Sequence, residues 1–200
     1  MENYQQSNSK EIYAESYIKY LTEILGKISS KEISDFIDTL IAASSRGSSI
    51  YFIGNGGSAA TASHFVNDIL IGTKSTNVPF RAISLCDNQA VITAIANDYG
   101  YEYIFSKQLA ALLKKNDVVV AISASGNSPN LLKAIDVARQ KEAITVGLVA
   151  FDGGKLKKMT DTSIHVPTLK GEYGPAEDAH MMLDHLVSSY LMQYVKDQLK

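Results

Sequence analysis

Hydrophobic residues recur at helical spacing along the first 47 residues of the chain. One apolar stripe runs from Lys10 to Ile28, and a second one follows it. Between the two stripes, Ser29 and Glu32 have the spacing of a capping box, and Gly47 supplies a C-terminal stop. We therefore predict two amphipathic helices, over residues 10–28 and 29–47. Their apolar faces pack either on their own domain or against a second subunit.

From residue 49 onward the hydrophobic pattern changes to short apolar runs separated by helical segments. The runs predict strands near residues 49–53, 80–85, 117–123, 143–151 and 163–167. The helical segments lie at about 58–70, 88–96, 102–114, 129–141 and 175–198, with Asp87 and Ser128 as N-caps of the second and fourth. This alternation favours an α/β domain over residues 1–200, built on a parallel sheet that is covered on both faces.

The composition is that of an ordinary globular protein. Of 200 residues, 46% are hydrophobic and 20% charged, and 19 basic side chains against 21 acidic ones leave a net charge of −2. This balance argues against disorder and against a general nucleic-acid binder. The lone Cys86 excludes an internal disulfide. Because the first ten residues lack an apolar signal core and no run approaches 18 apolar residues, we expect a cytoplasmic protein without a membrane span.

Two small polar loops each join a predicted strand to a predicted helix. The glycine loop, GNGGS, covers residues 54–58, and the serine loop, SASGNS, covers residues 123–128. Ligands of parallel sheets bind beyond the carboxyl ends of the strands, where helix N-termini offer free N–H groups. Neither loop matches the G-x-x-x-x-G-K-[ST] or G-x-G-x-x-G nucleotide patterns, so a monophosphate on a small organic ligand is favoured. Either loop alone could equally be a tight strand-to-helix turn.

Two groups of ionisable residues are candidates for metal or acid–base chemistry. His64 and Asp68 are four apart on one predicted helix, so they share a face and could ligate zinc. The alternative is a half-buried histidine beside a neighbouring acid. The last helix carries a second group that could instead form a solvated polar face: Glu177, Asp178, His180, Asp184 and His185. Spacing alone does not select ligands among these five.

The segments GNGGSAATASHF, AISASGNSPNLLKAI and AFDGGKL give the chain a family resemblance over nearly its whole length. The sequence resembles the sugar isomerase (SIS) domain of the phosphoheptose isomerase family. The resemblance implies a three-layer αβα sandwich around a five-stranded parallel sheet. It also implies a ketose–aldose isomerase that converts sedoheptulose 7-phosphate to D-glycero-D-manno-heptose 7-phosphate.

The resemblance also implies one zinc ion per subunit. The family's ligand positions fall on His64, Asp68, Glu177 and His185. Asp68 stands where the family usually has Glu, and Glu177 where it usually has Gln, so both positions keep oxygen ligands. The shorter Asp68 leaves open whether Asp68 or Glu177 is the catalytic base, with His185 as the second proton carrier. The stretch EYGPAED departs from the family's Arg-containing approach to the last helix, which leaves the sugar specificity open.

The substrate contacts implied by the resemblance fall mainly on the two loops. The phosphate is expected on the serine loop and the sugar on the glycine loop, with further contacts from the helix near residue 97 and from the last helix. The expected residues are Asn55, Gly56, Gly57, Ser58, Asn97, Asp98, Ser123, Ala124, Ser125, Ser128 and Glu177.

Two other classes share the SIS domain. One is a non-catalytic regulator that binds DnaA or senses a phosphosugar, and the other is an amino-sugar phosphate lyase or synthase. Ligand-type residues at all four metal positions favour the enzyme. By the same resemblance we expect a homotetramer with its active sites at subunit contacts.

Overall fold

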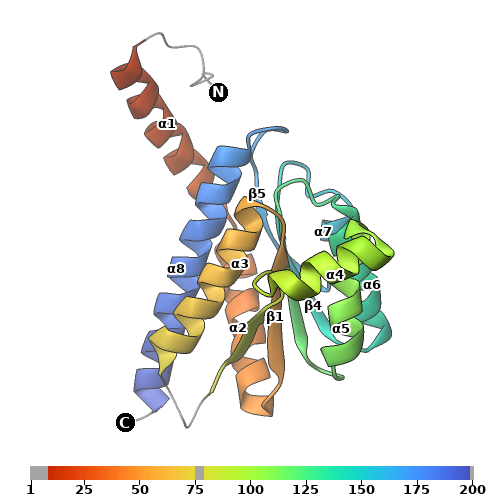
Figure 1. Cartoon of the computed structure of the whole chain (residues 1–200). Coiled ribbons are helices and arrows are strands. Elements are labelled where there is room, and N and C mark those ends of the chain that lie inside the picture. Colours follow the sequence, from red (N-terminus) through yellow and green to blue (C-terminus); the bar gives the residue numbers. More distant parts are fainter. Residues whose placement is uncertain (1–8, 75–78, 199–200) are drawn as a thin grey trace.

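The computed structural model describes residues 9–74 and 79–198. Its centre is a parallel five-stranded sheet, as predicted, and the strands have the order β2-β1-β3-β4-β5 (Figure 1). All residues of β1 and β3 are buried, which explains their continuous apolar sequences. The strands are β1 (Ser49–Gly54), β2 (Arg81–Ser84), β3 (Val118–Ser123), β4 (Ile144–Ala150) and β5 (Thr162–Val166).

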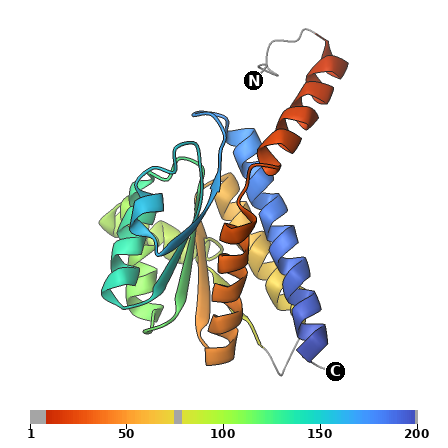
Figure 2. The same ribbon diagram turned by 180° about the vertical axis from the view of Figure 1, so that it is seen from behind.

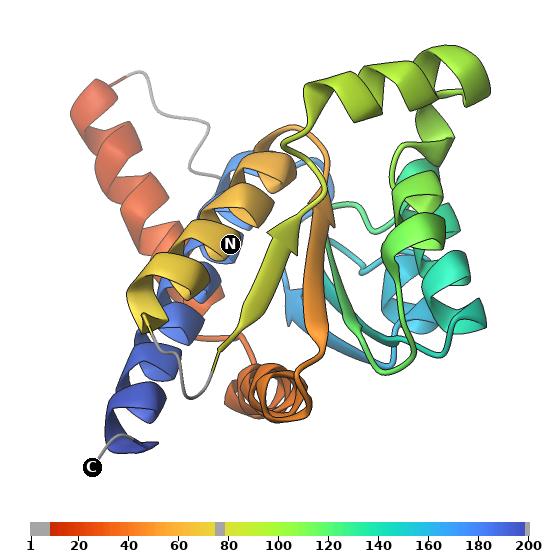
Figure 3. The ribbon, with the colours of Figure 1, turned by 60° about the horizontal axis from the view of Figure 1, so that its bottom comes forward.

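Helices cover both faces of the sheet and complete three layers (Figure 3). One face carries α2 (Ser30–Arg46), α3 (Gly57–Asn67) and α8 (Tyr173–Gln198), and the other carries α4 (Gln89–Tyr99), α5 (Ser106–Leu112), α6 (Pro129–Gln140) and α7 (Leu156–Met159). On the α2/α3/α8 side, the ring of Phe65 stacks on Phe52 of β1 at 5.1 Å and meets Phe36 of α2 edge-on at 6.1 Å. These rings fix α3 against the sheet.

The first helix, α1 (Lys10–Leu25), extends beyond the body of the protein (Figures 1 and 2). Its C-terminal half packs near α8 and buries Tyr20 and Ile24. Ile12 and Ile18, further toward the N-terminus, remain 55% and 65% exposed. The N-terminal part of α1 therefore carries exposed apolar side chains, whereas its C-terminal part is packed.

Most predicted caps are confirmed, with one correction. The Ser29 side chain accepts the N–H of Glu32, and Gly47 adopts φ +69° after α2. The prediction of Asp87 as an N-cap is wrong, because the neighbouring Asn88 caps α4 by accepting the N–H of Val91. Asp87 instead accepts the hydroxyl of Ser63.

Three further details differ from the predicted elements. The segment 102–114 divides into a 3-10 turn, η3 (Tyr101–Tyr103), and α5. The short α7 was not predicted, and α3 continues as a π-helical turn, η2 (Asp68–Gly72). In the part of the chain that the structure describes, no helix is both long and apolar enough to span a membrane. The polar stretch behind the expectation of no signal peptide lies largely outside the described residues, at positions 1–8.

Candidate functional site

The two polar loops lie side by side at the carboxyl edge of the sheet. β1 and β3 are neighbours, but the chain leaves β1 toward β2 on one side and enters β4 from β3 on the other. Such a reversal opens a crevice in which α/β proteins bind ligands. A pocket of about 130 Å³ lies there, lined by Asn55, Ser58, Ile122, Ser123, Ala124, Ser125, Ser128, Leu131, Tyr173 and Glu177. It joins the predicted phosphate loop to the predicted sugar loop.

The serine loop is held in shape by its own hydroxyls and by the loop after β4. Ser123 Oγ accepts the N–H of Gly126 at 3.1 Å, and Ser125 Oγ accepts that of Asn127 at 3.3 Å. Gly126 has φ +62°, and a Cβ there would lie 2.1 Å from the carbonyl oxygen of Gly153. The two loops therefore pack backbone to backbone, which accounts for the glycines of the AFDGGKL segment.

A pair of amides joins the glycine loop to the start of α6. Asn55 Nδ2 donates to Asn130 Oδ1 at 3.0 Å, and Asn130 Nδ2 donates to Asn55 Oδ1 at 2.8 Å. The hydroxyl of Tyr101 donates to the same oxygen of Asn55 at 3.0 Å. This network fixes the position of Asn55 at the mouth of the pocket. Asn130 and Tyr101 were not predicted as site residues.

Glu177 lies in the first turns of α8, against the start of α3. A Cβ built on Gly57 would come within 2.3 Å of its carboxylate, so only glycine leaves room for Glu177 there. The carboxylate thus sits near the N-terminus of α3, where free N–H groups and the helix dipole favour a negative charge. Glu177 faces the same pocket as the serine loop.

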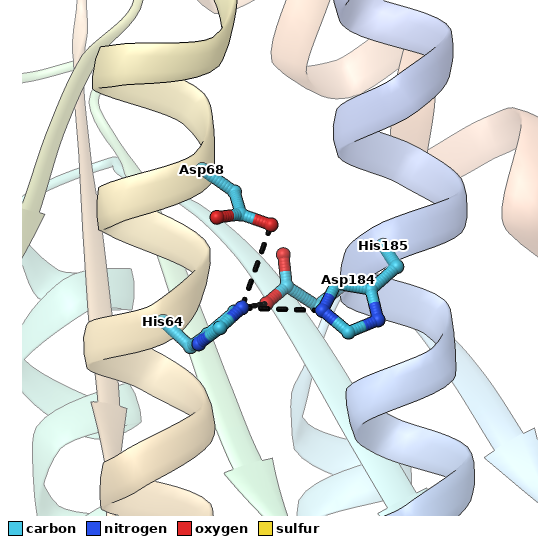
Figure 4. A group of neighbouring side chains, drawn as sticks. All are labelled: His64, Asp68, Asp184 and His185. Atoms are coloured by element: carbon cyan, nitrogen blue, oxygen red, sulfur yellow. Dashed lines mark hydrogen bonds and ion pairs between the residues drawn. The ribbon is translucent and has the colours of Figure 1, made fainter.

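The helices α3 and α8 run side by side in the same direction away from this pocket (Figure 1). Gly57 meets Glu177 at their beginnings, and His64 meets Asp184 and His185 seven to eight residues further along. This register brings together four side chains that can bind a metal ion. One donor atom of each lies within 4.8 Å of one donor atom of every other (Figure 4). We call this group the His/Asp cluster: His64, Asp68, Asp184 and His185.

Distances within the His/Asp cluster match those between metal ligands. His64 Nε2 lies 3.1 Å from His185 Nε2, 3.5 Å from Asp68 Oδ2 and 3.9 Å from Asp184 Oδ2. Bonds of about 2.1 Å to a tetrahedral zinc ion would separate two donors by about 3.4 Å. The donor set therefore fits a divalent cation such as zinc.

The electrostatics of the cluster centre on one buried carboxylate. The side chain of Asp184 is fully buried, its Oδ1 accepts the Ser188 hydroxyl at 3.0 Å, and its Oδ2 has no hydrogen-bond partner among the described residues. The pKa of Asp184 is raised to about 6, chiefly by burial; the Ser188 hydrogen bond and the two cluster histidines lower this pKa, and the Asp68 carboxylate raises it. Burial also lowers the pKa of nearby His180 to about 4.

The predicted site residues fall into three places. The residues that line the pocket are Asn55, Ser58, Ser123, Ala124, Ser125, Ser128 and Glu177, and Gly56 and Gly57 lie in the loop beside it. Three further predicted residues, His64, Asp68 and His185, belong to the His/Asp cluster. Asn97 and Asp98 lie apart from both, exposed on α4, where Asn97 Nδ2 donates to Asp98 Oδ1 at 2.9 Å.

The His/Asp cluster differs in one member from the ligand set that the resemblance implies. Glu177 does not lie in the cluster, because eight residues of α8 separate it from His185 by about 12 Å of helical rise. Asp184 is the fourth member of the cluster. Its sequence signal was an acidic residue in the apolar stripe that also contains Leu183, Val187 and Leu191. Tyr173, a pocket residue that was not predicted, has no comparable signal.

Comparisons with known proteins agree with this architecture. A family model described as SIS domain matches residues 13–150. A phosphoheptose isomerase of Trichlorobacter lovleyi is 37% identical over 161 residues, which cover 80% of this chain and 81% of the relative.

Solved structures extend the likeness to nearly the whole chain. A phosphoheptose isomerase structure from Neisseria gonorrhoeae is similar with a TM-score of 0.82 and 29% identity, covering 91% of this chain and 97% of the other. One from Francisella tularensis has a TM-score of 0.85 and 26% identity, covering 92% and 99%. The match to the SIS domain and the identity to curated relatives agree with the two loops and the fold. The chain belongs to the phosphoheptose isomerase family of SIS-domain proteins.

Proposed function

We propose that this protein is a phosphosugar isomerase that interconverts sedoheptulose 7-phosphate and D-glycero-D-manno-heptose 7-phosphate. The observation that carries the proposal is the pairing of two sites along α3 and α8. A small pocket lined by four serines lies where the helices begin, and the His/Asp cluster lies further along them. Such an arrangement suits a ligand with a phosphate at one end and a reacting carbonyl at the other.

The spacing of the two sites supports a long sugar. Ser58 and His64 are six residues apart on α3, which is about 9 Å of helical rise. Carbon–carbon bonds of about 1.5 Å give an extended seven-carbon sugar phosphate a reach of roughly 9 Å from phosphorus to C2. The pocket of about 130 Å³ is smaller than the roughly 300–1,000 Å³ of complete ligand sites, so it suits the phosphate end alone.

In this proposal the serine loop anchors the phosphate. Ser123, Ser125 and Ser128 supply hydroxyl donors, and the backbone N–H of Ala124 adds another. The N-terminus of α6, which begins at Pro129, adds the positive end of its dipole. Asn55 is held by the amide pair with Asn130 and is ready to bind a sugar hydroxyl without reorganisation.

The isomerisation moves one proton between C1 and C2 of the sugar, with the carbonyl end toward the His/Asp cluster. Asp68 is the partly exposed carboxylate of the cluster, so we assign it the role of general base. His185 is exposed on the facing helix and can carry the second proton between the two oxygens. Glu177 lines the pocket, and there it would accept hydrogen bonds from sugar hydroxyls.

A zinc ion fits the donor set of the cluster, with the two histidines and the nearby carboxylates as its ligands. When bound, such an ion polarises a carbonyl oxygen and stabilises developing negative charge. The Nε2 atoms of His64 and His185 lie 3.1 Å apart, which suits two nitrogen ligands of one ion.

The proposal includes a homotetramer in the cytoplasm, as expected from the sequence. The observations in its support are two uncovered apolar surfaces. Ile12 and Ile18 of α1 are exposed, and none of the residues of α4, all of which are described, is buried although the helix is rich in Ala, Val and Ile. Asn97 and Asp98 lie on α4. If a partner subunit packs against α4, these two side chains would lie close to the partner's active site.

A substrate series tests the proposal. Purified zinc-loaded protein is mixed with ketose phosphates of five, six and seven carbons, and aldose formation is followed by NMR. We expect turnover to be fastest with sedoheptulose 7-phosphate, because only the longest chain joins the two sites. Turnover of none of the three would contradict the proposed activity, and a preference for the five-carbon sugar would contradict the proposed substrate length.

A further inference from the structure

We propose that Asp184 is a metal ligand of this protein and that it takes the place expected for Glu177. The metal site then consists of His64, Asp68, Asp184 and His185, and Glu177 is left free to contact the substrate. This inference rests on the proposed function only in assuming that the His/Asp cluster holds a divalent cation.

The orientation of Asp184 is the first observation that carries the inference. Ser188, one turn later on α8, donates its hydroxyl to Oδ1 of Asp184 at 3.0 Å and so fixes the carboxylate plane. The second oxygen, Oδ2, is then directed across the helix interface to His64 Nε2, 3.9 Å away (Figure 4). Metal-binding carboxylates are usually oriented by a hydrogen bond from a neighbouring residue, and Ser188 supplies such a bond to Asp184.

The burial of Asp184 is the second observation. Its side chain is fully buried, and Oδ2 has no hydrogen-bond partner among the described residues. A buried polar atom left without a partner is costly, and a cation placed between the two helices would satisfy it. Because the side chain is inaccessible, a substrate cannot reach it. A ligand role suits Asp184 better than a role in proton transfer.

The position of Glu177 is the third observation. Its carboxylate lies against Gly57 at the start of α3 and lines the phosphate pocket. About 12 Å of helical rise separates Glu177 from His185, so the two side chains would have to converge along α8 to share an ion. Asp184 needs no such movement, because its carboxylate already lies beside both histidines.

The charge of the resulting site is balanced. Two carboxylates, from Asp68 and Asp184, and two neutral imidazoles compensate the charge of a divalent cation. A carboxylate is a hard ligand that complements the imidazole nitrogens in a zinc site. The helix α8 thus supplies two adjacent ligands, Asp184 and His185, and α3 with its π-helical turn supplies His64 and Asp68.

Zinc affinity of three variants tests the inference. Asp184→Leu removes the ligand while keeping the site filled, Glu177→Ala removes the alternative ligand, and Asp136→Asn changes an exposed carboxylate on α6 as a matched control. By competitive calorimetry with a chelator we expect Asp184→Leu to weaken zinc binding roughly 100-fold or more. Glu177→Ala and Asp136→Asn should bind zinc like the native protein. The reverse pattern, with Glu177→Ala losing zinc and Asp184→Leu retaining it, would overturn the inference.

Cobalt substitution provides a readout that does not depend on activity. The visible absorption of bound Co²⁺ reports its ligands, so the spectrum should change in Asp184→Asn and stay unchanged in Glu177→Gln. Circular dichroism checks that each variant is folded, and Asp184→Asn serves if Asp184→Leu does not fold. An unchanged spectrum in Asp184→Asn would overturn the inference. Zinc binding that depends on Asp184, in a native protein without isomerase turnover, would support this inference and overturn the proposed function alone.

Discussion

The Nε2 atoms of His64 and His185 lie 3.1 Å apart although 121 residues separate them in the chain. Two neutral imidazoles can share such a contact only if one donates a proton to the other, or if a cation takes the place of the proton. The rings meet at an interplanar angle of 72°, and both nitrogens are directed into the space between α3 and α8. The contact thus puts two nitrogen donors where the proposed zinc ion would bind.

The two histidines should be equally necessary for zinc. We expect His64→Ala and His185→Ala each to purify without zinc under conditions in which the native chain holds one ion per subunit, because each removes a nitrogen ligand. Both side chains are at least partly exposed, so neither change should alter the fold. Metal analysis by mass spectrometry measures the zinc content. Zinc at native stoichiometry in either variant would contradict the site.

The serine loop should account for phosphate binding. Ser128→Ala is the cleaner single change, because Ser128 caps α6 without a side-chain hydrogen bond, whereas the Ser123 and Ser125 hydroxyls also hold the loop. Loss of one hydrogen bond to a charged group costs about 1.5–3 kcal/mol, which is roughly a tenfold to 150-fold rise in Kd. Calorimetry with a sugar phosphate measures it. Unchanged affinity with all three serines replaced by Ala would contradict the assignment.

The two candidate bases should separate in kinetics. Asp68→Asn should lower kcat by orders of magnitude, because it removes the carboxylate beside the reacting carbons. Glu177→Gln keeps hydrogen bonding to the sugar, so it should chiefly raise KM. Steady-state kinetics of both zinc-loaded variants decides between them. If Glu177→Gln loses kcat and Asp68→Asn does not, the base is on α8.

Burial of His180 should make stability depend on pH. The pKa of His180 is lowered from 6.5 to about 4 in the folded state, so between these values the unfolded chain binds the extra proton. The contribution of His180 to folding stability is therefore lost as the pH falls from 6.5 to 4. We expect the unfolding free energy of the native chain to fall by about 3 kcal/mol relative to His180→Leu between pH 7 and 4.

Urea unfolding in the presence of a chelator measures this difference. Asp184, whose pKa burial raises to about 6, titrates in the same range with the opposite sign, because its folded form holds the proton. It is present in both proteins, so its effect cancels in the comparison. A stability difference that does not change with pH would contradict the burial of a neutral His180.

The uncovered apolar faces should hold the subunits together. Replacing both Ile12 and Ile18 of α1 by Glu puts charges on a surface that is 55% and 65% exposed in the single chain, so the fold should survive. Light scattering at micromolar concentration should give a tetramer for the native protein and smaller species for the variant. A native monomer would contradict the proposed assembly, and an unchanged tetramer in the variant would contradict the role of α1.

Much of the fold could be predicted from local sequence signals. The alternation of apolar runs with helical segments specified the parallel sheet, and Ser29, Gly47 and Pro129 marked helix ends where the structure has them. The prediction of Asp87 as an N-cap was wrong, because Asn88 is an equally good N-cap and Asp87 makes a tertiary contact with Ser63 instead. The loops were predictable because glycines and serines leave room for an anion.

The parts of the site that depend on contacts between distant segments could not be predicted. The amide pair of Asn55 and Asn130 joins residues 75 apart, and nothing local signals it. The grouping of Asp184 with His64 follows from the register of α3 against α8, which begins with the contact of Gly57 and Glu177. That register is set by packing on the sheet, and sequence spacing along α8 alone does not contain it.

The most direct test of the account is a zinc titration of the chelated protein during turnover of sedoheptulose 7-phosphate. The phosphate pocket and the His/Asp cluster act together in this account, so activity should be absent without metal, rise in proportion to added zinc and stop rising at one ion per chain. Circular dichroism of the chelated protein should still show the native fold, because the sheet core does not include the cluster. Full turnover in the chelated protein would contradict the account.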